Sequence, residues 1–185
     1  SATSVISCAN PNAAGIYRRW VDALGHAIIK KATFYIGGLK IDSQISEWFD
    51  IWNELTDPNS FYDSLVDKGY TSAANDDDKK RLYVPLQFWF NRNKGLALPL
   101  ISLQYHEVLL KIELRDLKSL VLSNGNSVSA SGKMEEFSIY IDYINLDNDE
   151  RKRFAQHSHE YLIEQVQYNN YDLSDGDNSV TLDLN

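Results

Sequence analysis

The side chains best suited to chemistry near neutral pH are four histidines, His26, His106, His157 and His159. His157 and His159 lie two residues apart, so on a strand they would share a face, and with Glu160 they supply the donor types of a metal site. No cysteine pair, H-E-x-x-H pattern or third ligand at a diagnostic interval accompanies them. We therefore expect no metal site and interpret both residues as surface or helix-end histidines.

Acid–base and nucleophilic chemistry have no stronger support. His106 precedes Glu107, but neighbours on a strand point to opposite faces, so the two are poorly placed to cooperate. There is no G-x-S-x-G pattern, Gly37-Gly38 lacks the surroundings of a phosphate-binding loop, and the single cysteine, Cys8, has no histidine nearby. We predict that the chain is not an enzyme and has no catalytic, cofactor-binding or metal-binding residues.

Trp48 and Trp52 are the remaining candidates for a binding site, as a platform on which a sugar ring could stack. Their i, i+4 spacing also places them on one face of a helix, where large aromatic rings usually pack against a sheet. We favour the packed helix face over the sugar platform.

Composition restricts the class of protein. A chain of 185 residues is most simply one domain, and one cysteine excludes an internal disulfide. The net charge of -8 argues against a protein that binds nucleic acid directly, because phosphate binding requires clustered lysine and arginine. No apolar stretch approaches the length of a transmembrane helix. The aromatic content of 12% suits broad buried faces or contacts between subunits.

The elements that would position these side chains are mostly strands. Alternation after His106 predicts a half-buried strand to Arg115, with Val108, Leu110, Ile112 and Leu114 on one face. Aromatic and branched residues predict a strand over Leu82 to Phe90, ended by the polar turn at 91–95. Gly37-Gly38 predicts a hairpin between strands at Ala27 to Ile36 and Leu39 to Ile41. Further strands are predicted at Glu136 to Ile144, Tyr161 to Tyr168 and Val180 to Leu184.

Short helices and loops fill the connections. Helical spacing predicts a helix over Ser46 to Thr56, stopped by Asp57-Pro58, and a short helix within Phe61 to Tyr70. Asp147 is a suitable N-cap for a helix over Asn148 to Gln156. The expected loops are residues 1–20 with at most one short strand, Asn75 to Arg81, and an exposed connection or hairpin over Leu117 to Lys133. With no repeated β-α-β unit, the fold expected is all-β: a single antiparallel jelly-roll β-sandwich over residues 1–185.

Four segments, in this order, resemble the major capsid proteins of nucleocytoplasmic large DNA viruses, the group that includes iridoviruses, chlorella viruses and African swine fever virus. They are Trp20 to Asp42, Glu47 to Thr56, Tyr83 to Arg115 and Asp149 to Gln167. The third is the most specific, because its apolar stretch leads into a strand through Gln104-Tyr105-His106-Glu107.

The resemblance implies that the chain is most of the N-terminal jelly roll of a double jelly-roll subunit. Three subunits would form a pseudo-hexagonal capsomer that tiles an icosahedral shell. The partners would be copies of itself in a homotrimer, neighbouring capsomers and minor capsid proteins. The protein would belong to the virion and assemble in the host cell cytoplasm. Phe88, Trp89 and Phe90 would lie in a sheet, and the loop Asp76 to Lys80 would lie in a connection.

Relative to that family, we expect the chain to start after the N-terminal arm and first strands and to stop before the second jelly roll, which would make it a fragment, an incompletely represented subunit or a divergent single-domain relative. In each case we expect a neighbouring segment or chain to complete its sheets. Two alternatives stay open: a jelly-roll carbohydrate-binding module that uses exposed Trp and Tyr, and a cupin-like metal enzyme built around His157 and His159.

Overall fold

A computed structural model of the chain describes residues 2–8, 18–57, 59–69, 80–123, 132–160, 162–171, 179 and 181. Its strands are β1 (Ala2–Cys8), β2 (Arg18–Trp20), β3 (Ile29–Ile36), β4 (Leu39–Ile45), β5 (Lys80–Val84), β6 (Val108–Leu114), β7 (Val121–Ser123) and β8 (Gly132–Ile139). Its helices are α1 (Leu24–Ile28), α2 (Ser46–Thr56), α3 (Asp63–Val66), α4 (Trp89–Arg92) and α5 (Asn148–Gln156), with 3₁₀ turns η1 (Lys94–Leu96) and η2 (Leu117–Leu120).

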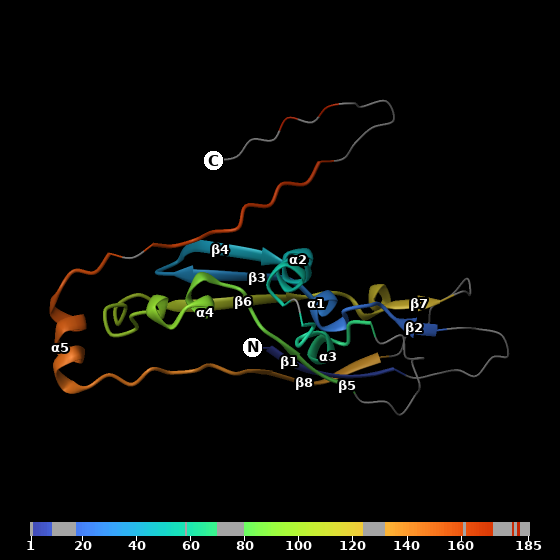
Figure 1. Cartoon of the computed structure of the whole chain (residues 1–185), viewed down its shortest axis with the longest axis horizontal. Helices are drawn as coiled ribbons and strands as arrows, with labels where there is room; N and C mark the ends of the chain where they lie inside the picture. The colour runs from blue at the N-terminus through green and yellow to red at the C-terminus, as the bar shows by residue number, and fades with distance from the viewer. Residues whose placement is uncertain are drawn as a thin grey trace.

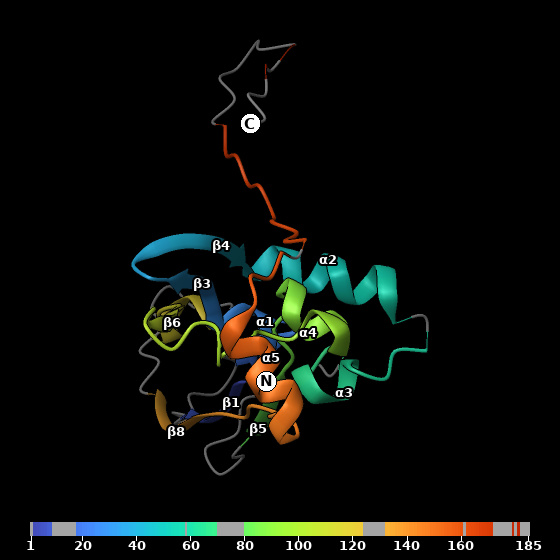
Figure 2. The same ribbon diagram turned by 90° about the vertical axis from the view of Figure 1, so that its left-hand side faces the viewer.

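The described strands form three sheets, with orders β5-β1-β8, β2-β7 and β4-β3-β6, and every pairing is antiparallel. The sheet β4-β3-β6 lies above the sheet β5-β1-β8, with α1, α2 and α3 beside them, in both views (Figures 1 and 2). The predicted antiparallel pairing is confirmed. No sheet among these residues closes on itself, and helices contribute more of the fold than the sequence predicts.

The hairpin of β3 and β4 is confirmed. Gly37 and Gly38 have φ of 57° and 81°, a left-handed conformation that glycine adopts without strain, so the chain reverses tightly between the strands. The strand predicted after His106 is confirmed as β6, which pairs with the other edge of β3. Val108, Leu110 and Ile112 pack toward the core, whereas Leu114 at the end of the strand is exposed.

The main core lies between β3 and a group of side chains that folds over it. Phe34 of β3 contacts three aromatic rings: Phe88 at 5.7 Å between ring centroids, Trp89 at 5.5 Å and Phe90 at 4.8 Å. The buried members of this cluster are Ile29, Ala32, Phe34, Phe49, Val66, Val84, Leu86, Phe88 and Trp89. A second core joins Trp20, Leu24, Ile28, Leu82, Leu120 and Val121.

The predicted strand over Leu82 to Phe90 is wrong beyond Val84. Pro85 has no backbone N–H to donate to a neighbouring strand, and β5 ends immediately before it. Phe88 remains extended, and Trp89 begins the short helix α4. Phe88, Trp89 and Phe90 therefore do not lie in a sheet but pack across the face of one.

The predicted strand over Ala27 to Ile36 begins two residues late, at Ile29, because the preceding residues form α1. Leu24 and Ile28, four residues apart, are both buried on one side of this helix. Gly25 permits the close approach of α1 to α3, since a Cβ at this position would lie 3.0 Å from Val66 Cα. Tertiary packing thus overrides the strand propensity of this stretch.

Two predicted connections contain more structure than expected. Residues 1–20 hold two strands, β1 and β2, rather than at most one. Of the exposed connection or hairpin predicted over Leu117 to Lys133, residues 124–131 lie outside the described residues. Residues 117–123 form η2 and β7, and Leu120 and Val121 are buried because β7 pairs with β2 against the second core. The short helix expected within Phe61 to Tyr70 is confirmed as α3, of which Val66 is buried.

Toward the C-terminus, one prediction is confirmed and two are corrected. The helix α5 spans the predicted residues and Asp147 caps it, accepting hydrogen bonds from the N–H groups of Asp149 at 3.1 Å and Glu150 at 2.8 Å. β8 ends at Ile139, which pairs with Ala2 of β1, rather than at Ile144. Of the strand predicted over Tyr161 to Tyr168, Tyr161 lies outside the described residues, and residues 162–168 form no strand because no described strand pairs with them.

Three remaining expectations fall on undescribed residues. Positions 75–79 of the charged loop lie outside the described residues, while Lys80 and Arg81 begin β5. The predicted loop Asp76 to Lys80 therefore lies outside the described residues except for Lys80. The strand predicted at Val180 to Leu184 lies outside the described residues except for Thr181.

Candidate assembly surfaces

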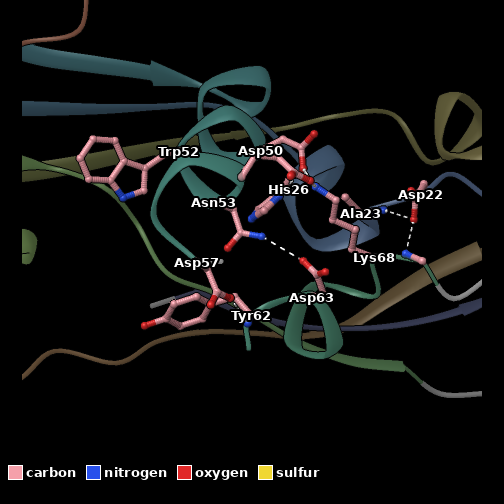
Figure 3. A network of polar contacts seen from close by, with 12 residues as sticks. Asp22, Ala23, His26, Asp50, Trp52, Asn53, Asp57, Tyr62, Asp63 and Lys68 are labelled. Atoms are coloured by element: carbon pink, nitrogen blue, oxygen red, sulfur yellow. Dashed lines mark hydrogen bonds and ion pairs between the residues drawn. The ribbon is translucent and has the colours of Figure 1, made fainter. Parts of the chain in front are cut away.

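A polar network ties the three helices α1, α2 and α3 together (Figure 3). His26 of α1 is buried, with 4% of its surface exposed, and its Nδ1 lies 3.5 Å from Asp50 Oδ1 of α2. That distance is too long for a good hydrogen bond, and the two side chains attract by charge only when His26 is protonated. Lys68, just after α3, donates from Nζ to Asp50 Oδ1 at 2.9 Å and also to Glu54 of α2.

Further hydrogen bonds extend the network around the same helices. Asn53 Nδ2 of α2 donates to Asp63 Oδ1 of α3 at 3.0 Å, and the N–H of Tyr62 donates to Asp57 Oδ2 at 2.7 Å. Asp22 Oδ1 accepts from the N–H of Gly69 at 2.7 Å, which joins the start of α1 to the segment after α3. These contacts fix the relative positions of helices that have few turns of their own.

Burial shifts the ionisation of this network. It lowers the pKa of His26 from its ordinary value of 6.5, and the attraction of Asp50 offsets this only in part. Burial acts to raise the pKa of Asp50, but the hydrogen bond and charge of Lys68, followed by His26, outweigh it and lower that pKa overall. Burial likewise acts to lower the pKa of Lys68, but hydrogen bonds to Asp50 and Glu54 outweigh it and raise that pKa.

The His26–Asp50 pair has the residue types of an acid–base site but not the access. A general base must come within hydrogen-bond reach of the substrate, and His26 is enclosed between α1 and α2, with the ring of Phe49 at 6.3 Å. The network therefore holds the fold. The sequence gives no sign of it, because His26 and Asp50 lie in different elements with no motif spacing between them.

The other histidines do not converge. His106 is exposed and lies against the hairpin turn, where a Cβ on Gly37 would be 3.0 Å from its Nδ1. His157 is exposed and forms the C-cap of α5, while His159 stacks on Phe154 with 4.7 Å between ring centroids. Within the described residues no group of three or more His, Cys, Asp or Glu could hold a metal ion. The structure describes the backbone of Cys8 but not its side chain.

Trp48 and Trp52 lie on one side of α2, with ring centroids 5.8 Å apart and planes inclined at 47°. The guanidinium of Arg92 lies 4.0 Å from the ring centroid of Trp52 and covers that face. Both tryptophans are partly buried. Tilted rings with one face covered do not form the flat, open platform that a sugar requires.

Two extended segments in the C-terminal part of the chain carry half of the exposed large apolar side chains of the described residues. The first begins in β8 and continues beyond it with the exposed side chains Phe137, Ile139, Tyr140, Ile141, Tyr143 and Ile144. The second follows α5 and carries Leu162, Ile163, Tyr168 and Tyr171. Large apolar side chains gathered on a surface mark places where another segment or subunit binds. Among the described residues, no helix is long and apolar enough to cross a membrane.

Comparison with known proteins identifies the family of a chain built in this way. The family model described as "Major capsid protein N-terminus" matches residues 2–147. The chain belongs to this family. The major capsid protein of Pyramimonas orientalis virus is 45% identical over 151 residues, covering 78% of this chain and 37% of the relative. Capsid protein 1 of Acanthamoeba polyphaga mimivirus is 36% identical over 188 residues, covering 90% of this chain and 31% of the relative.

The fold of the chain also matches a solved virus capsid structure. A quasi-atomic structure of the PBCV-1 virus capsid matches with a TM-score of 0.69 and 33% identity, over 89% of this chain and 39% of that one. The chain spans about a third of the length of its curated relatives. The family resemblance read from the sequence is confirmed, and membership places the chain among structural capsid proteins rather than enzymes.

Proposed function

We propose that the chain is part of a viral major capsid protein that forms a shell by associating with copies of itself. The observation that carries this proposal is the match to a virus capsid structure over 89% of the chain at 33% identity. The family model for the N-terminus of major capsid proteins supports it independently. The proposed work is done by shape and contact surface, without bond chemistry.

In this proposal, residues 1–185 make up most of the N-terminal jelly roll of a double jelly-roll subunit. Three subunits form a pseudo-hexagonal capsomer, and capsomers tile an icosahedral shell in the virion after assembly in the host cell cytoplasm. Neighbouring capsomers and minor capsid proteins are the further partners. The two layers of antiparallel strands in Figures 1 and 2 support the jelly roll.

The exposed segment after β8 is the proposed contact region. Ile141 and Tyr143 are 63% and 69% exposed, and they continue the alternating pattern of β8. Large apolar side chains exposed along one segment mark places where another chain binds. An obligate interface of this kind buries on the order of 2,000 Å² or more in total.

The test is the mass of the full chain in solution, by analytical ultracentrifugation with electron microscopy of the particles. We expect the wild-type chain to form trimers and the variant Ile141→Asp/Tyr143→Asp to sediment as a monomer, because two carboxylates cannot be buried unpaired in an apolar interface. Leu39→Asp, at a side chain 71% exposed in the hairpin of β3 and β4, is the matched control and should remain trimeric. A stable wild-type monomer at every concentration would contradict self-association.

A further inference from the structure

The segment after α5 leaves the body of the molecule in extended form (Figures 1 and 2), yet three consecutive residues hold it to the body. Glu164 Oε2 accepts a hydrogen bond from Arg92 Nη1 at 2.8 Å. Gln165 Nε2 donates to the carbonyl oxygen of Ile41. The N–H of Val166 donates to Asp42 Oδ1 at 3.1 Å.

Ile41 and Asp42, which accept two of these hydrogen bonds, lie at an irregularity in β4. Tyr35 pairs with Lys40 and Phe34 with Asp42, so Ile41 is the extra residue of a β-bulge and faces no partner on β3. Its carbonyl oxygen is therefore available at the outer edge of the strand. This edge of β4 carries no other strand among the described residues.

Asp42, next to the bulge, is a buried carboxylate with 2% exposure. Its Oδ1 accepts from the N–H of Ser43 at 2.8 Å as well as from Val166, and its Oδ2 accepts from Gln44 Nε2 at 3.0 Å. A buried charge is tolerated when hydrogen-bond donors surround it. The extended segment supplies one of the three donors that Asp42 receives.

The contact between Arg92 and Glu164 is part of the same network of buried polar groups. Gln44 is fully buried and donates to the carbonyl oxygen of Gln87 at 2.8 Å, which also accepts from Arg92 Nε at 3.2 Å. Arg92 is held in place on its other side by the ring of Trp52. Its Nη1 is thus directed toward Glu164 by buried groups.

We propose that Ile41, Asp42 and Arg92 form a binding site for an extended peptide segment, and that Glu164-Gln165-Val166 of the same chain occupies it as a latch. The site takes a carboxylate, a side-chain amide and a backbone N–H from three successive residues. Occupancy covers the outer edge of β4 at its bulge, where an uncovered edge would pair with foreign strands. This inference does not depend on the role of the chain in a capsid.

Amide hydrogen exchange of the full chain tests the latch. We expect the amide of Val166 to exchange more slowly than that of Tyr171, and Glu164→Ala to speed its exchange by about two- to fivefold, the range for a surface ion pair. Glu160→Ala, at an exposed carboxylate of the same segment, is the matched control and should leave Val166 unchanged.

Three results would overturn the proposal. Val166 exchanging as fast as Tyr171 in the wild-type chain would show that no latch forms. An equal effect of Glu160→Ala would show that the charge of the segment, and not the Arg92 contact, matters. Protection that rises with protein concentration would show that the site binds a second copy. A urea midpoint for Glu164→Ala equal to that of the wild type establishes that the variant remains folded.

Discussion

At the scale of the residue, the chain places its ionisable side chains in structural roles. His26 is the clearest case, since it is enclosed by charged groups on the elements around it: Asp50 of α2, Asp63 of α3, and Lys68. It contributes to how α1 meets α2 rather than to chemistry on a substrate. The burial of His26 makes the stability of the fold depend on pH.

Because burial holds the pKa of folded His26 below 6.5, the unfolded chain binds a proton more readily than the folded chain as pH falls below that value. The free energy of unfolding should therefore decrease from pH 7 to pH 5, and this component should be absent in His26→Leu. Urea unfolding at each pH measures it. The range stays above the region in which Asp50, with its own lowered pKa, is protonated. An unchanged slope in His26→Leu would refute this role, and His157→Gln, at an exposed histidine, should keep the wild-type slope.

At the scale of the element, turns and caps fix where strands and helices begin and end. The N-cap of α5 is an example, because the helix contains no buried residue and depends on local interactions. Local signals of this kind are also those that the sequence reveals most reliably.

Asp147→Ala should destabilise α5 by about 1 kcal/mol, because the N–H groups of Asp149 and Glu150 lose their acceptor. Faster amide exchange across residues 148–156 measures the loss. Asp142→Ala removes an exposed carboxylate from the preceding connection and should leave that exchange unchanged. Equal exchange in the two variants would show that the cap contributes nothing.

The hairpin of β3 and β4 offers a paired test of backbone strain and space. Gly37→Ala and Gly38→Ala should each cost about 1 kcal/mol, because both positions have positive φ. Gly37→Ala should cost more, since its Cβ would lie 3.0 Å from His106 Nδ1, whereas nothing lies within 4 Å at Gly38. Thermal unfolding compares them, and the difference should vanish in a His106→Ala background. A difference that persists there would exclude His106 as its cause.

At the scale of the whole molecule, the main core connects the sheet β4-β3-β6 to α2, α3 and the segment around α4. Phe88 is fully buried at its centre and stacks on Phe90 with ring planes 10° apart. The sheets and helices should therefore unfold together when this packing is lost.

Phe88→Ala should lower the free energy of unfolding by about 3–5 kcal/mol, because it removes a buried ring and leaves a cavity. Phe61→Ala makes the same change at a side chain 68% exposed and should alter stability by no more than about 0.5 kcal/mol. Urea unfolding followed by tryptophan fluorescence measures both. Similar losses in the two variants would contradict the placement of Phe88 in the core.

The sequence by itself determined the elements whose signals are local. The bounds of α2 and α5, the cap at Asp147 and the glycine turn after β3 follow from helical spacing, a side-chain acceptor and positive φ. The order of the four segments also determined the family. Such features depend on interactions among residues close in the chain, which periodicity records.

Only the tertiary structure decided which extended residues become strands and which polar residues meet. Phe88 to Phe90 have strand-forming side chains but fold over a sheet, and residues 162–168 alternate yet lack a partner strand. The contacts of His26 with Asp50, and of Asp42 with Val166, join elements distant in the chain. A strand exists only when another strand pairs with it, and a buried polar group only when donors surround it, so both depend on the whole fold.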